Sequence, residues 1–196
     1  VLFRSPEKGP DEEIVKKGVT VRFSPNPKLD RIIEVLLAKE PHQKTIVWAC
    51  FQHDIEEIHK ACKLNGIRSV TYYGKTSETA RAEAEHAFNF GSAAVFIGNP
   101  GAGGTGLNLL GYPPGTPSDY SVDHVIYYSQ NWSSITRTQS EDRPHRRGTI
   151  NNVQVTDLCV PNSIDEQIRA RVVEKRSSAL QITDIRQILR EVFNRG

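Results

Sequence analysis

Methionine is absent from the 196 residues of this chain, cysteine occurs three times, and no apolar run is long. Because a natural start carries methionine and the first residue is Val1, we expect an excised fragment or a processed product. The longest apolar runs, such as residues 93–97, are far too short to span a bilayer. No charged-then-apolar signal segment opens the chain, and we expect no membrane association.

Cys50, Cys62 and Cys159 are an odd number of cysteines without close spacing. This argues against a disulfide framework, and it argues against zinc because no two of them lie within the reach of a zinc knuckle. We therefore predict no metal site, and we interpret all three cysteines as buried free thiols in a reducing compartment.

Net charge is also small, since 25 Lys and Arg residues against 23 Asp and Glu residues leave +2. This balance does not by itself indicate nucleic-acid binding. The charge is uneven, however, because residues 137–147 hold four arginines against Glu141 and Asp142. Apolar residues make up 37% of the chain and charged residues 24%, which is typical of a folded globular protein and not of a disordered one.

Short apolar strands alternate with helical patterns from residue 28 onward. The expected strands are 45–50, 68–73, 93–97, 122–128 and 153–160. The expected helices are 28–39, 54–64, 78–90, 134–142, 164–179 and 183–193. This alternation predicts an α/β fold of three layers, in which a mostly parallel sheet has helices on both faces. Because ligands of such sheets bind at the carboxyl ends of the strands, the loops after the strands are the candidate site.

The two ends of the chain differ from this pattern. Residues 1–27 are polar and contain four prolines, so we interpret them as a linker or arm from a preceding lobe. We assign residues 28–162 to the α/β domain and residues 163–196 to C-terminal helices. Ser163 and Glu166 have the spacing of a capping box at the start of the first of these helices.

A glycine cluster, residues 101–106, follows the third strand and contains G-x-G-x-x-G. Read as a dinucleotide fingerprint, it predicts an NAD-type site. Asn99 and Pro100 separate the glycines from the strand, however, and residues 107–110 are too short for a pyrophosphate-binding helix. The alternatives are a tight turn that needs positive φ and a glycine turn whose amides approach a phosphate or ribose.

Residues 73–77, after the second strand, end in Gly-Lys-Thr, the tail of a phosphate-binding loop. Ser69 stands where that loop needs its first glycine, and the chain has no Asp-Glu pair at a strand end to hold Mg²⁺. What remains is a phosphate contact through Lys75 and two hydroxyls, or a helix cap by Thr76 or Ser77.

Residues 139–148 carry the third signal. Arg143 and Arg146 are three residues apart and would face the same way on a helical turn, which suits phosphate oxygens. Pro144 between them must end or distort the helix. The alternative is a solvated basic face that pairs with Glu141 and Asp142. A fourth loop, after the fourth strand, contains Trp132, which packs or stacks there.

Taken in order, these segments resemble the C-terminal RecA-like lobe of a superfamily-2 helicase, closest to the Swi/Snf-type DNA translocase ATPases. The resemblance covers residues 28–180. The matching segments are 45–54 (motif IV), 73–77 with Arg81 (the "dGsts…R" segment), 98–109 (motif V), 139–148 (motif VI, Q-x-x-x-R-x-x-R-x-G) and 164–167 (the segment that braces the two lobes).

The resemblance implies an ATP site shared with an N-terminal RecA-like lobe, which would also hold the Mg²⁺. Arg143 and Arg146 would reach the ATP phosphates, with Arg146 as the arginine finger. Gly104 and Gly106 would line the nucleotide side of the cleft, and Gln139 would position the nucleotide or the attacking water.

The same resemblance implies contacts with the phosphates of a tracked DNA strand, duplex DNA by analogy. The residues that would make them are Lys75, Thr76, Thr105 and Asn108. The expected function is therefore the second motor lobe of an ATP-dependent helicase or translocase that is inactive alone. The alternatives are a standalone nucleic-acid-binding or protein-interaction module and an NAD-binding oxidoreductase.

Some residues depart from the family pattern: Pro144, Arg147, Thr149 and an insertion at 112–120. These departures indicate a divergent branch, bacterial or viral. The implied location is the cytoplasm of a bacterium or of a virus-infected cell, or the nucleus if the source is a eukaryote.

Overall fold

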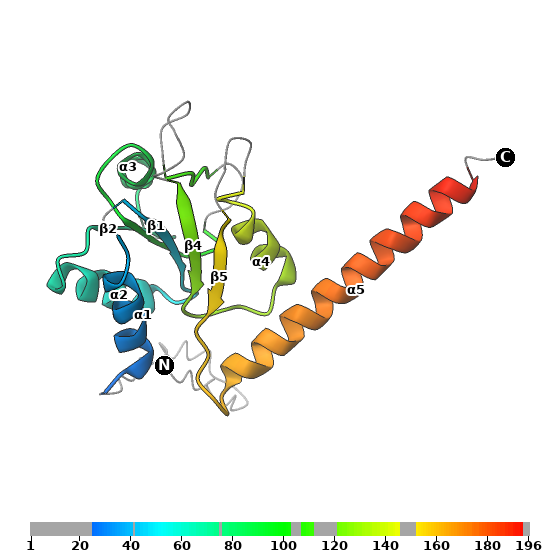
Figure 1. The fold of residues 1–196 in the computed structure, drawn as a ribbon, viewed down its shortest axis with the longest axis horizontal. Helices are drawn as coiled ribbons and strands as arrows, with labels where there is room; N and C mark the ends of the chain where they lie inside the picture. Colours follow the sequence, from blue (N-terminus) through cyan, green and yellow to red (C-terminus); the bar gives the residue numbers. More distant parts are fainter. Residues whose placement is uncertain are drawn as a thin grey trace, which may run out of the picture.

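Five parallel strands form the central sheet in a computed structural model that describes residues 25–40, 42–74, 76–102, 107–111, 121–145 and 152–193, with side chains as far as Ser178. The strands are β1 (Lys44–Trp48), β2 (Ser69–Tyr72), β3 (Val95–Gly98), β4 (Val122–Tyr127) and β5 (Gln154–Asp157). Their order across the sheet is β2-β3-β1-β4-β5, and every neighbouring pair is parallel. All five carboxyl ends therefore meet at one edge of the sheet (Figure 1).

Helices cover both faces of this sheet (Figure 1). They are α1 (Pro27–Leu37), α2 (Gln52–Leu64), α3 (Glu78–Asn89), α4 (Ser134–Glu141) and α5 (Ile164–Phe193). The predicted three-layer α/β fold with a parallel sheet is confirmed.

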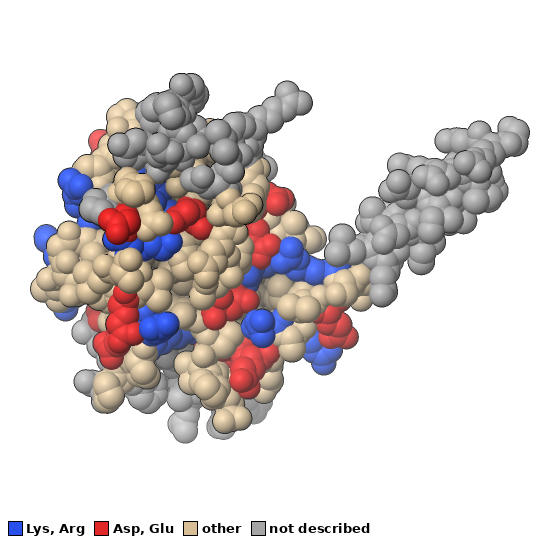
Figure 2. Space-filling view, viewed as in Figure 1, with Lys and Arg blue, Asp and Glu red and all other residues tan. Residues whose placement is uncertain are grey.

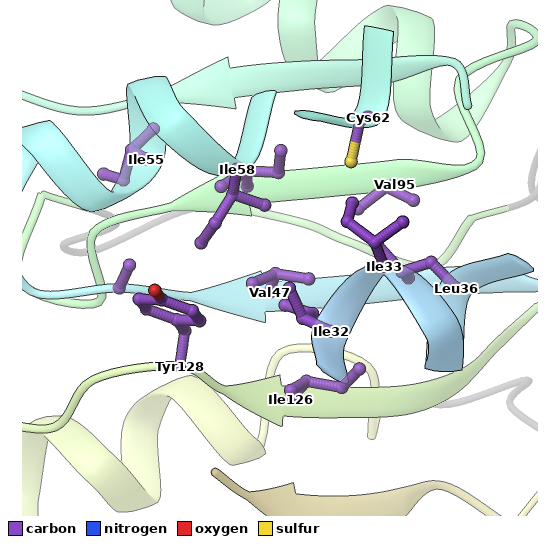
Figure 3. Packing of buried hydrophobic residues seen from close by; sticks show 12 residues of the cluster. Ile32, Ile33, Leu36, Val47, Ile55, Ile58, Cys62, Val95, Ile126 and Tyr128 are labelled. Atoms are coloured by element: carbon purple, nitrogen blue, oxygen red, sulfur yellow. The ribbon is translucent and has the colours of Figure 1, made fainter. Parts of the chain in front are cut away.

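One core lies between the sheet and helices α1 and α2. Ile32 of α1 and Ile58 of α2 pack on Val47, Val95 and Ile126 of the three central strands, and Figure 3 shows these side chains meeting. The apolar residues of α1 recur at helical spacing, so that one stripe of the helix is buried.

A second core fills the opposite face. Trp48, Phe96 and Tyr127 point to this side from β1, β3 and β4, and Phe88 of α3 covers them with Leu109. The Trp48 and Phe96 ring centroids lie 6.0 Å apart in an edge-to-face arrangement. Because β1 is buried on both faces, its residues 46–48 form an unbroken apolar run, without the alternation of a half-exposed strand.

Polar side chains cap the starts of α1 and α3, whereas α2 begins at Gln52, two residues before the predicted start, without a side-chain cap. The Asn26 side chain accepts a hydrogen bond from the Leu29 amide at 3.1 Å, and Pro27 occupies the first turn of α1. The Ser77 hydroxyl accepts from the Ala80 amide at 3.2 Å, which confirms it as the cap of α3.

The C-terminal helices differ from the prediction. In place of two helices, 164–179 and 183–193, the structure has the single 30-residue helix α5. Thr183 has the residue type of a helix cap, but no Gly or Pro precedes it within α5 to interrupt the backbone hydrogen bonds. Ile168 and Val172 are buried at its first turns, and the helix then extends away from the sheet (Figure 1). At its start the Ser163 hydroxyl accepts from the Asp165 amide at 3.2 Å, while Glu166 accepts from the Asn162 amide rather than that of Ser163.

All three cysteines are free, but only Cys62 is fully buried, while Cys50 and Cys159 are half-buried. Burial raises the pKa of the Cys50 thiol to about 12 and that of Cys62 to about 11, so both stay protonated at neutral pH. On the face drawn in Figure 2, basic and acidic side chains are intermixed, in keeping with the small net charge. Among the described helices none has the length and apolarity to cross a membrane.

Candidate functional site

The loops after β1, β2 and β3 are joined at the carboxyl edge of the sheet by Asn99. Its Nδ2 donates to the Cys50 carbonyl at 2.7 Å, and its backbone amide donates to the Tyr72 carbonyl at 3.0 Å. Its Oδ1 accepts from the Gly101 amide at 2.8 Å and so shapes the start of the glycine-rich loop. Asn99 is therefore a site residue that the sequence argument treated only as a spacer.

Gly98 allows this loop to begin where it does. A Cβ at this position would lie 2.9 Å from the Phe96 ring, 3.1 Å from the Trp48 ring and 3.2 Å from the Tyr72 carbonyl oxygen. Only glycine fits this close approach without movement of its neighbours. The chain can then pass directly from a buried strand into the glycine-rich segment.

A buried polar chain connects the loops after β1 and β4. The Ser129 hydroxyl accepts from the Cys50 amide at 2.9 Å and donates to Asp54 Oδ2 at 3.0 Å. Burial raises the pKa of Asp54, which is 6% exposed at the start of α2, while the Ser129 hydrogen bond opposes that rise. These contacts hold the β1 and β4 loops in a fixed relation.

The loop after β2 is held by Arg81 of α3. Its guanidinium donates to the Gly74 carbonyl at 2.8 Å and to the Tyr73 carbonyl at 3.3 Å. Thr76 closes the turn, because its Oγ1 accepts from the Tyr73 amide at 3.3 Å. Lys75 lies outside the described residues. The predicted phosphate contact Thr76 thus sits in a tight turn whose backbone is tied to a helix.

Arg143 follows the C-cap of α4 and reaches the segment after the glycine cluster. Its Nη1 donates to the Leu107 carbonyl at 3.1 Å, and the residue is half-buried. Leu107 comes directly after Gly106, so the structure brings the predicted motif VI arginine to the end of the predicted motif V loop. Arg146, Gly104, Gly106 and Thr105 lie outside the described residues.

Two more predicted site residues are described, one on α4 and one attached to α3. Gln139 is exposed on α4, one turn before Arg143. Asn108 is attached to α3, because its amide donates to Glu85 Oε1 at 3.0 Å and its carbonyl accepts from Asn89 Nδ2 at 2.6 Å. Within the described part of the chain, its buried Oδ1 has no hydrogen-bond partner.

Arg137 is a buried charge that the sequence argument counted but gave no role. It is 8% exposed, and its guanidinium lies 3.5 Å from the centroid of the Tyr127 ring. It donates to Asp157 at 2.6 Å, to Glu141 at 2.6 Å and to Gln130 at 2.8 Å. The i,i+4 spacing from Arg137 to Glu141 was the available signal in the sequence.

The described donor next to Leu107 suits an anion better than a metal ion. In the described ranges, no group of three His, Cys, Asp or Glu side chains could hold a metal. An arginine guanidinium such as that of Arg143, which donates to the Leu107 carbonyl, is a typical partner of phosphate oxygens. The described residues therefore fit contact with a nucleotide phosphate.

This sheet order, the two helical layers and the loops at the carboxyl edge define a RecA-like α/β domain. The family model "Helicase conserved C-terminal domain" matches residues 27–148. The chain belongs to this helicase C-terminal domain family, and it is a lobe of the Swi/Snf type, as its relatives show.

Relatives include the DNA repair and recombination protein RAD54B of Mus musculus, which is 24% identical over 159 residues, 80% of this chain and 17% of that protein. The ISWI chromatin-remodeling complex ATPase ISW1 of Saccharomyces cerevisiae is 26% identical over 202 residues, 100% of this chain and 16% of that protein. The chain thus spans about a sixth of these relatives.

A solved structure, the C-terminal part of the Fun30 ATPase domain, superposes with a TM-score of 0.64 at 22% identity. The match covers 74% of this chain and 45% of the other. At this identity the likeness bears on the fold, and it agrees with the RecA-like architecture.

Proposed function

We propose that the chain is the second motor lobe of an ATP-dependent DNA translocase or helicase, and that it completes an ATP site formed with an N-terminal RecA-like lobe. The observation that carries this proposal is the contact of Arg143 Nη1 with the carbonyl that follows the glycine cluster. This contact brings a cation next to the end of the predicted motif V segment, so two segments that the family resemblance assigns to the nucleotide lie together.

In this site, Arg143 and Arg146 stabilise the charge that develops on the transferred phosphoryl group. Arg146 is the arginine finger, a role that increases kcat by about 10³–10⁵ in comparable enzymes. Gly104 and Gly106 line the nucleotide side, and Gln139 orients the nucleotide or the attacking water. When bound with ATP, Mg²⁺ neutralises phosphate charge, and its ligands belong to the N-terminal lobe.

The DNA contacts belong to the loops after β2 and β3. Lys75 and Thr76 on the first loop, with Thr105 and Asn108 on the second, bind the phosphates of a tracked strand, and duplex DNA is the proposed substrate. Because both lobes would hold the backbone, closure on ATP and reopening after hydrolysis move the lobes along the strand.

Two further parts of the proposal concern the chain's ends and its location. Residues 1–27 connect to the N-terminal lobe, and residues 163–196 brace the two lobes. The relatives named above are repair and remodelling proteins of a mammal and a yeast. They favour a nuclear protein and give no support to the expected bacterial or viral source.

The test is DNA-stimulated ATP turnover by the protein that contains both lobes, compared with this chain alone. We expect steady turnover from the two-lobe protein and none from the chain by itself. A standalone binding module instead predicts salt-sensitive DNA binding by this chain and no ATPase in any context. Membership of the helicase family leaves the NAD-dependent alternative without support.

A further inference from the structure

The last residue of α4, Glu141, is held between two arginines. Its Oε1 lies 2.6 Å from Arg137 Nε, and its Oε2 lies 2.8 Å from Arg176 Nη1 of α5. The contact with Arg137 is shielded from solvent, since the two side chains are 14% and 9% exposed, whereas the Arg176 side chain is 40% exposed. Arg143 comes two residues later, directly after the C-cap Asp142. The clamp on Glu141 therefore lies immediately before the arginine that reaches Leu107.

The inner side of this clamp is fixed to the sheet. Arg137 stacks on Tyr127 at the end of β4 and donates to Asp157 at the end of β5. It also donates to Gln130 in the loop after β4. One guanidinium thus joins α4 to two neighbouring strands, and its planar fork can serve three acceptors at once.

The outer side of the clamp is α5. Besides Arg176, Arg169 of α5 lies 3.3 Å from Asp157 Oδ2, and Lys175 donates to the Trp132 carbonyl at 3.1 Å. Figure 2 shows basic and acidic side chains meeting where α5 leaves the domain. Asp157 and Glu141 are therefore each shared between Arg137 and an arginine of α5.

We propose that Arg137 is a positioning residue for Arg143: by fixing Glu141 and the end of α4 against β4, β5 and α5, it sets where the Arg143 guanidinium stands at the nucleotide. The inference rests on the proposed function and adds a residue outside motif VI to it. A catalytic side chain misplaced by about 1 Å loses about a hundredfold in rate, so the support of α4 matters for turnover even though Arg137 touches no phosphate.

The experiment uses the two-lobe protein with Arg137→Met and Arg137→Lys. We expect each to lower kcat about ten- to hundredfold while the KM for ATP changes less than about threefold, because the support acts on the transition state. Lysine should not rescue, since one ammonium cannot replace the planar fork. Rescue by lysine would show that only the charge matters and would overturn the proposal. Arg171→Ala is the matched control, because Arg171 is 64% exposed and pairs with Glu174 within α5.

A double-mutant cycle separates positioning from general loss of structure. In an Arg143→Lys background, Arg137→Met should cost little further kcat, whereas a merely structural role gives multiplicative losses and contradicts the proposal. Should Arg137→Met fail to fold, Arg176→Ala provides the second variant, and we expect a smaller fall in kcat in the same direction. Unchanged kcat in Arg137→Met and Arg176→Ala would refute the inference alone; a wild-type protein without ATPase would refute the proposed function instead.

Discussion

Lys44→Met should destabilise this domain although the lysine is not one of the predicted site residues. Lys44 is 8% exposed at the start of β1, and its ammonium donates to the Phe88, Gly91 and Ala93 carbonyls at 2.8, 3.0 and 2.7 Å. Two of these carbonyls lie at the end of α3 and just beyond it, where a helix leaves its last carbonyls without partners. The ammonium therefore caps the C-terminus of α3 and links it to β1.

The magnitude follows from two opposing effects. Hydrogen bonds from a charged donor contribute about 1.5–3 kcal/mol each, so three of them contribute about 5–9 kcal/mol. Burial of the ammonium opposes this by several kcal/mol, and the same burial lowers the pKa of Lys44. Methionine avoids that cost but leaves three carbonyls unpaired, and we expect a net loss of about 2–4 kcal/mol in the free energy of unfolding.

Urea denaturation of the chain, followed by far-UV circular dichroism, measures this loss. Lys60→Met is the matched control, since Lys60 is exposed on α2 and its replacement should change the unfolding free energy by less than about 0.5 kcal/mol. A loss in Lys44→Met no larger than that of the control would refute the capping argument.

Two further perturbations follow from the structure. Gly98→Ala should lower the unfolding free energy by about 1–3 kcal/mol in the same assay, because the new Cβ would press on Phe96 and Trp48. Gly74→Ala is the control, since a Cβ there would meet no atom within 4 Å and should leave the unfolding free energy unchanged. Equal losses in the two variants would contradict the packing argument. Burial, aided by Lys39, lowers the pKa of His124 from 6.5 to about 4, so the unfolded chain takes up a proton in this window that the folded chain does not. Stability should therefore fall as pH drops from about 6.5 towards 4, and the slope should be smaller in His124→Asn when unfolding is measured across that range; equal slopes would exclude His124 as the cause.

The three central strands, β3, β1 and β4, could be predicted from the sequence because they are short, largely apolar and bounded by clear signals. β1 is buried on both faces, and the cap residues Asn26 and Ser77 lie next to the segments that they start. These are local effects, and local patterns report them directly. The single helix α5 could not be predicted in the same way. Thr183 has the residue type of a helix cap, but it lies inside a continuous helix.

The contacts that build the site join residues far apart in the sequence. The sequence therefore indicated the candidate site residues but not the side chains that hold them in place. Arg137 meets Asp157 across 20 positions, and Asn99 meets Cys50 across 49. Asp123 stands at an irregularity in the β1–β4 register, where Lys44 pairs with Val122 and the next residue with His124. Such pairings depend on which strands become neighbours, and residue spacing along the chain does not contain that information.

The decisive measurement is steady-state ATP hydrolysis by the two-lobe protein carrying Arg146→Ala, with ATP affinity measured on the same sample. Arg143→Ala serves as the second variant, because Arg143 is the predicted phosphate-binding arginine whose contact, with the Leu107 carbonyl, is seen in the structure. We expect a fall of about 10³-fold or more in kcat for Arg146→Ala with ATP binding largely retained, because the arginine acts on the transition state. Near-normal kcat in both variants would contradict the assignment of this chain as the lobe that supplies arginines to a shared ATP site.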